Sequence, residues 1–142
     1  MAFALIATLS ACLFTGVAAY ITFVEHPARM ECGGTLALRE FAPSYRRAAV
    51  MQAALAAVGF LTAAGAWLAG MGASWLVAGV LLGAVIPFTL VVIFPTNKRL
   101  LDPSLDAGSQ AAIELLTRWG RLHAVRTALS LTALVVMLLA LW

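Results

Sequence analysis

Charged side chains are confined to two stretches of the chain, and long uncharged blocks separate them. Residues 1–24, 48–97 and 127–142 contain no Asp, Glu, Lys or Arg. A membrane-spanning helix needs about 20 mostly apolar residues, so the first block accommodates one span and the second accommodates two. The third block reaches this length when it is extended back to residue 121. The pattern predicts four spans in one domain over 1–142, at about 2–25, 47–69, 75–94 and 121–142.

Glycine and proline mark where these spans are expected to turn, bend or end. Two glycines in the stretch 70–74 predict the tight turn between spans two and three. Pro27 and Pro95 are expected to end spans one and three, because the residue before a proline disfavours helical backbone. Pro87 predicts a kink within span three.

The segments between the spans carry their own helix signals. Residues 35–42 can form a short surface helix that Pro43 is expected to break, leaving Ser44 as the N-cap of span two. Ser109 precedes a long run that Pro does not interrupt, so it is the expected N-cap of a helix over 110–142. At 1.5 Å per residue this helix is about 50 Å long, and its first turns extend beyond the hydrocarbon core.

Composition supports the same interpretation. With 63% hydrophobic and 11% charged residues, the chain is too apolar for a soluble domain of 142 residues. All nine basic and six acidic residues fall within 25–47 and 98–126. Lys and Arg in short loops remain cytoplasmic, so loops 26–46 and 95–120 are predicted to be cytoplasmic, with both termini on the non-cytoplasmic side of a bacterial-type inner membrane.

The expected partners follow from this placement. The net charge of +3 is assigned to membrane topology and anionic lipid headgroups, and no nucleic acid is expected. Small residues in spans two and three permit close helix packing and leave room for a homodimer. The bilayer and a hydrophobic small molecule are the remaining predicted partners.

Polar residues from all four spans are predicted to meet at the cytoplasmic end of the bundle. Ionisable groups beside spans are costly and tend to face the bundle interior or a cavity. The candidate catalytic residues are His123, His26, Arg126 and Asn97, and the candidate substrate-binding residues are Trp119, Tyr45, Arg46 and Glu25. Trp119, His123 and Arg126 share one helix face through their spacings of four and three.

The residue types present exclude several kinds of catalytic or binding site. The two cysteines, Cys12 and Cys32, form no Cys-x-x-Cys motif, and no His, Cys and Asp cluster has zinc spacing. There is no phosphate-binding glycine loop. Two chemistries remain. One is ligation of haem, copper or iron by His26 and His123. The other is acid–base catalysis by a histidine, with Arg126 and Asn97 stabilising an oxyanion.

Four sequence elements resemble those of the anthrone oxygenase-like membrane proteins, a family also described as a domain of unknown function. They are Phe23 to Arg29, Phe41 to Ala48, Pro87 to Leu100, and Trp119 to Thr127. The resemblance implies a bundle of four membrane helices. It also implies the activity of those relatives that oxidise an anthrone to an anthraquinone with dioxygen and no cofactor.

Three hypotheses follow. In the first, the chain is an oxygenase for an anthrone-like or phenolic substrate, His123 is the base, Arg126 and Asn97 hold the oxyanion, and Trp119 and Tyr45 stack on the ring. In the second, it binds haem or a metal through His26 and His123. In the third, it is a membrane subunit without enzymatic activity, and its polar end is a docking face.

Overall fold

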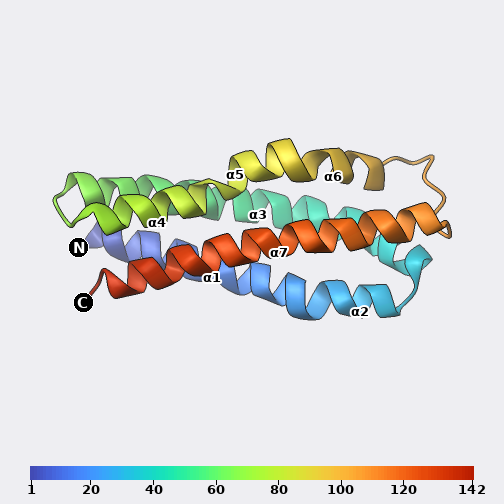
Figure 1. The fold of residues 1–142 in the computed structure, drawn as a ribbon, viewed down its shortest axis with the longest axis horizontal. Helices are drawn as coiled ribbons and strands as arrows, with labels where there is room; N and C mark the ends of the chain where they lie inside the picture. Colours follow the sequence, from blue (N-terminus) through green and yellow to red (C-terminus); the bar gives the residue numbers. More distant parts are fainter.

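The computed structural model describes residues 1–142, and its regular structure is entirely helical. The helices join into four long segments (Figure 1). The first consists of α1 (Ala2–Tyr20), the π-helical η1 (Ile21–Glu25) and α2 (His26–Glu31), and the second is α3 (Gly34–Leu68). The third consists of α4 (Ala73–Gly83), α5 (Val85–Phe88), the π-helical η2 (Thr89–Ile93) and α6 (Phe94–Leu100), and the fourth is α7 (Gln110–Leu139). All four are long and apolar enough to cross a membrane, which confirms the four-helix prediction.

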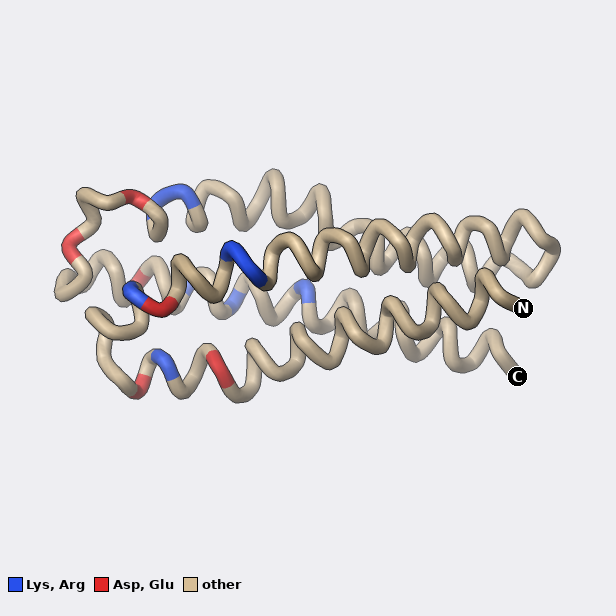
Figure 2. The backbone as a smooth tube through the Cα atoms, turned by 180° about the vertical axis from the view of Figure 1, so that it is seen from behind, with Lys and Arg blue, Asp and Glu red and all other residues tan.

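The segments form an elongated bundle with both termini at one end (Figure 1). α1 and α4 lie diagonally across from one another, and each packs against α3 and α7. The charged residues lie between the middle of the bundle and the end away from the termini (Figure 2). The chain is therefore a multi-pass membrane protein with one charged and one uncharged end.

The prolines at the ends of spans one and three do not stop their helices, so this expectation was wrong. His26 has helical backbone (φ −66°, ψ −45°), and α2 continues to Glu31. Likewise, Pro95 lies at the start of α6, which continues to Leu100. In each case a π-helical turn ends two residues before the proline. The wider turn makes room for the pyrrolidine ring, so the helix passes through it.

Pro43 also fails to break its helix, because α3 runs without interruption from Gly34 to Leu68. The side chain of Pro43 is exposed at the charged end of the bundle, where water can hydrate the carbonyl that loses its helical donor. Ser44 is consequently not an N-cap. Ser109 is the N-cap of α7 as predicted, and its Oγ accepts a hydrogen bond from the Ala112 amide at 3.2 Å.

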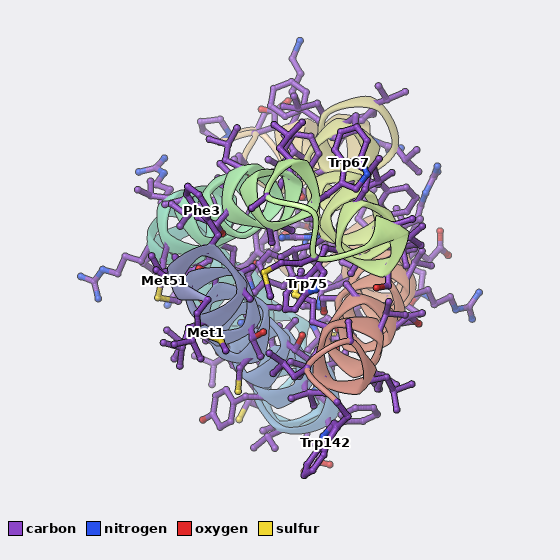
Figure 3. All side chains as sticks on the ribbon, turned by 90° about the vertical axis from the view of Figure 1, so that its left-hand side faces the viewer. Met1, Phe3, Met51, Trp67, Trp75 and Trp142 are labelled. Carbon is purple, nitrogen blue, oxygen red and sulfur yellow. The ribbon has the colours of Figure 1, made fainter.

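The uncharged half of the bundle is packed through small residues around one tryptophan. The turn after α3 contains Gly70 and Gly72 with φ of +81° and +107°, a backbone conformation that favours glycine. The indole of Trp75 follows this turn and points between the helices, whereas Trp67 and Trp142 lie outside (Figure 3). Exposed tryptophans at a bundle end are typical of a membrane interface.

Close packing of α4 on α3 depends on Gly79. A Cβ at this position would lie 2.9 Å from the Ala63 Cβ, so we expect Gly79→Ala to lower the free energy of unfolding by about 1–3 kcal/mol. Gly16→Ala is the matched control, because a Cβ there has nothing within 4 Å and alanine favours the helix by about 1 kcal/mol. Denaturation by sodium dodecyl sulfate in mixed micelles measures the free energy of unfolding of both variants. Equal effects of the two substitutions would contradict the assigned packing.

Candidate functional site

A cavity of about 170 Å³ lies between the helical segments and is lined by residues of all four. It is positioned between two core clusters, one containing Trp75 and the other containing Trp119. Nine of its 15 lining residues are hydrophobic. Tyr45 and Trp119 are among these nine. The other six are polar: Arg29 of α2, Ser44 and Gln52 of α3, Thr89 of η2, and His123 and Arg126 of α7.

A step in the third helical segment opens this cavity. Gly79 and Gly83 bring α4 into close contact with Phe60 of α3. Pro87 cannot donate a hydrogen bond to the Gly83 carbonyl, and the helix breaks at Ala84. The segment then steps outward at α5 (Figure 1), and the side chains of Val85, Ile86, Thr89 and Leu90 line the space that this leaves. The kink that Pro87 predicts is therefore present, and it forms one wall of the site.

Trp119 and His123 form a second wall. Their rings stack at a centroid distance of 4.9 Å and an interplanar angle of 28°. Phe41 meets the indole edge-on at 5.2 Å and itself stacks on Tyr45 at 5.6 Å, so four rings from α3 and α7 are packed together. Three residues of the sequence-based site, Trp119, His123 and Tyr45, line the cavity. A flat aromatic ligand would find stacking partners here.

Arg126 is buried beside this wall without an acidic partner. Its Nη2 donates to the Gln52 Oε1 at 2.8 Å, and its guanidinium lies 5.5 Å from the centre of the Phe14 ring. The only two ion pairs in the chain both belong to Arg29. The Nε of Arg126 and the Nε2 of Gln52 are buried and have no hydrogen-bond partner. An uncompensated cation at an apolar cavity favours a ligand that carries negative charge.

His123 is oriented by a hydroxyl group on a neighbouring helix. Its Nδ1 lies 3.0 Å from the Thr22 Oγ1 of η1, which in turn lies 2.8 Å from the Thr127 Oγ1. The Nε2 of His123 makes no hydrogen bond to the protein and is not enclosed by it, so this nitrogen is accessible from the cavity. The side chain is 2% exposed, and its free nitrogen can act as a proton acceptor.

Arg29 ties α2 to α3 at the outer edge of the cavity. It pairs with Glu25 and with Glu40, and Ser44 donates to the Glu25 Oε1 at 2.6 Å. The guanidinium carbon of Arg29 lies 5.8 Å from the centre of the Trp119 ring. Glu25, a candidate for substrate binding, is therefore used in this network and does not line the cavity.

Three other candidates also lie outside the cavity. His26 packs against Trp119 at 5.2 Å and against Gly120, where a Cβ would come within 2.4 Å of the imidazole. Asn97 is fully buried, and neither its amide nitrogen nor its oxygen has a partner. Arg46 is exposed. None of the three lines the cavity.

The possible metal donors are few. No group of three or more His, Cys, Asp or Glu side chains is placed to hold a metal ion. The two imidazoles of His26 and His123 both contact the indole of Trp119.

Sequence reasoning missed Gln52, Arg29 and Thr22. Gln52 is the only amide side chain between residues 48 and 96, and an amide within this apolar stretch was a signal that could have found it. Thr22 precedes His26 by one helical turn, but its partner His123 is 101 residues away. No local spacing indicates such a contact.

Comparison with known proteins identifies the family. A family model described as anthrone oxygenase matches residues 41–136, a range that begins in α3 and ends in α7. Among curated proteins no match was found. Among solved structures no match was found either. The matched range covers two thirds of the chain and includes Tyr45, Gln52, His123 and Arg126, so the chain belongs to the anthrone oxygenase family.

Proposed function

We propose that the chain oxidises a lipophilic anthrone-like or phenolic substrate with dioxygen and that His123 is the base. One observation carries this proposal: a histidine with a free nitrogen and an arginine without an acidic partner line the same apolar cavity. A neutral, weakly acidic substrate would lose a proton to the histidine, and the arginine would stabilise the anion that forms.

The reaction balances for an anthrone. His123 removes one proton from the methylene carbon, and the resulting anion is stabilised at its oxygen by Arg126. This electron-rich anion transfers electrons to dioxygen, and a C–O bond forms at the same carbon. Return of a proton gives a hydroperoxide. Loss of the second C–H proton breaks the O–O bond and releases water, leaving a carbonyl. One anthrone and one dioxygen therefore give one anthraquinone and one water.

Gln52 holds the oxyanion donor Arg126 in place. In the sequence-based hypothesis Asn97 was the second donor, but Asn97 does not line the cavity. Gln52 does line it, and its carbonyl already orients Arg126. Donors that are held before the reaction begins stabilise developing charge without reorganisation.

The cavity is of a suitable size for one aromatic ring of such a substrate. An apolar cavity of about 150 Å³ in a protein binds benzene. Two lining residues, Ala53 and Leu90, are exposed on the outside of the bundle. In a membrane they would face lipid, so we propose that the substrate reaches the cavity from the bilayer.

Oxygen consumption with an anthrone tests this function. Purified protein in detergent or nanodiscs is expected to consume one dioxygen per anthraquinone formed and to release no hydrogen peroxide. Uncatalysed oxidation is subtracted with a heat-inactivated sample. A rate no higher than that of the inactivated sample, across several anthrones and phenols, would overturn the proposal.

The orientation of the bundle follows from its charges. We propose that the charged end faces the cytoplasm, because all nine basic residues lie there and positively charged loops are retained on that side. Alkaline phosphatase fused after Trp142 is then expected to be active, and green fluorescent protein fused there is expected to be dark. The reverse result would place the termini in the cytoplasm.

A further inference from the structure

A pair of threonine hydroxyl groups lies on the Nδ1 side of the His123 imidazole. Thr127 lies one turn after His123 on α7, and Thr22 lies on η1 across from both. The Thr127 Oγ1 is within hydrogen-bond distance of three oxygens: the Thr22 hydroxyl at 2.8 Å, the Ala18 carbonyl at 3.2 Å and the His123 carbonyl at 3.3 Å. The Thr22 hydroxyl is the only protein group that bonds to the imidazole Nδ1.

Counting protons favours one direction for these bonds. Thr127 has one hydroxyl proton, and carbonyl oxygens only accept. If this proton pointed at Thr22, the Thr127 oxygen would face two carbonyl oxygens without a proton between them. Donation of this proton to a carbonyl is therefore the favoured arrangement. The contact between the two hydroxyls still requires a proton, and only Thr22 can supply it.

The local backbone bonds of the other threonines support this assignment. Five threonines donate a hydrogen bond to the carbonyl four residues earlier in the chain, which is the usual hydrogen bond of a threonine hydroxyl in a helix. They are Thr8, Thr62, Thr89, Thr117 and Thr132. Thr22 makes no such bond. The carbonyl four residues before it belongs to Ala18 and accepts instead from Thr127. The Thr22 proton therefore has a partner on α7 and not on its own helix.

We propose that Thr22 is a positioning residue that holds His123 in the tautomer protonated at Nδ1. Since the Thr22 proton is donated to Thr127, its oxygen must accept from His123, and this requires an N–H at Nδ1. A neutral imidazole has one N–H, so Nε2 carries the lone pair. Nε2 is the nitrogen that is accessible from the cavity. The proposal rests on the proposed function in one respect: the Nε2 lone pair is taken as the base that removes the substrate proton.

The tautomer can be observed without a substrate. Protonated and unprotonated imidazole nitrogens have well-separated ¹⁵N chemical shifts, and the chain contains only two histidines. In protein labelled with ¹⁵N-histidine and reconstituted in lipid, at a pH where His123 is neutral, we expect a protonated Nδ1 and an unprotonated Nε2 at this residue. The His123→Gln variant assigns the signals. A protonated Nε2 in the wild-type protein would overturn the proposal.

Two substitutions at Thr22 provide matched variants. Thr22→Val keeps the shape but removes the acceptor, so the Nδ1–H loses its partner and the signal is expected to shift towards the Nε2–H tautomer. Thr22→Ser keeps the hydroxyl and is expected to retain the wild-type tautomer. An unchanged tautomer in Thr22→Val, in protein that elutes as the wild type does on size exclusion, would also overturn the proposal.

Activity measurements then distinguish a failure of this proposal from a failure of the proposed function. If the wild type oxidises an anthrone, Thr22→Val is expected to lower kcat about tenfold or more, because part of the contribution of the base is lost, while KM changes little and Thr22→Ser remains active. Wild-type kcat in Thr22→Val would contradict the positioning role. If the wild type oxidises no anthrone, the proposed function fails, and the ¹⁵N spectra still decide whether Thr22 sets the tautomer.

Discussion

His123→Ala is expected to lower kcat for anthrone oxidation by about 10²–10⁴-fold, the contribution that a positioned general base usually makes. The physical reason is that the Nε2 of His123 is the only imidazole nitrogen at the cavity, whereas the ring of His26 packs against Trp119 and Gly120 outside it. The measurement is the initial rate of oxygen consumption at saturating anthrone, with anthraquinone formation followed by absorbance.

Chemical rescue is the control for this substitution. His123→Ala leaves a space of imidazole size against the indole of Trp119, and added imidazole is expected to restore a measurable part of the rate. The same addition is expected to leave the rate of Arg126→Gln unchanged, since that variant retains its base. Wild-type turnover in His123→Ala would remove the base assignment, whereas rescue of both variants would indicate a nonspecific effect of imidazole.

Arg126→Gln is expected to lower kcat by about 10²–10³-fold, in line with the loss of one oxyanion donor. Arg126→Lys is expected to lie between this variant and the wild type, because it keeps the charge but loses the planar fork that bonds to Gln52. Arg121→Gln is the matched control. It removes an exposed arginine from the same helix and is expected to retain wild-type kinetics.

The thermal stability of Arg126→Gln is not expected to fall with its activity. The guanidinium of Arg126 is buried without a carboxylate, and burying an unpaired charge is costly. Arg126→Gln should therefore leave the thermal unfolding midpoint unchanged or raise it, even though turnover falls. A residue that lowers stability in order to serve activity behaves in this way. A large loss of stability together with a proportional loss of activity would instead assign Arg126 a structural role.

The sequence by itself determined the architecture. Long uncharged blocks are stable only as apolar helices in a membrane, so the number of helices, the turn at Gly70 to Ser74 and the charged end were all predicted correctly. It also placed the three α7 residues of the candidate site together. Trp119, His123 and Arg126 share a face because of helical spacing alone, and all three line the cavity.

Only the tertiary structure decided how the helices pass through Pro27 and Pro95. Local rules predict a stop at each proline, because they treat every turn as α-helical. A π-helical turn before each proline instead lets packing against neighbouring helices continue to Glu31 and Leu100. These extensions place Arg29 at the cavity and Glu25 in an ion pair.

The hydrogen-bond partners at the site were likewise beyond the reach of sequence. Gln52 bonds to Arg126 across 74 residues and Thr22 to His123 across 101, so the rotation of each helix about its axis decides both contacts. The same rotation turns Asn97 and His26 away from the cavity and leaves Arg46 exposed. Residue type and depth along a span indicate which groups lie near one end of a bundle. Packing of one helix against the next selects those that meet.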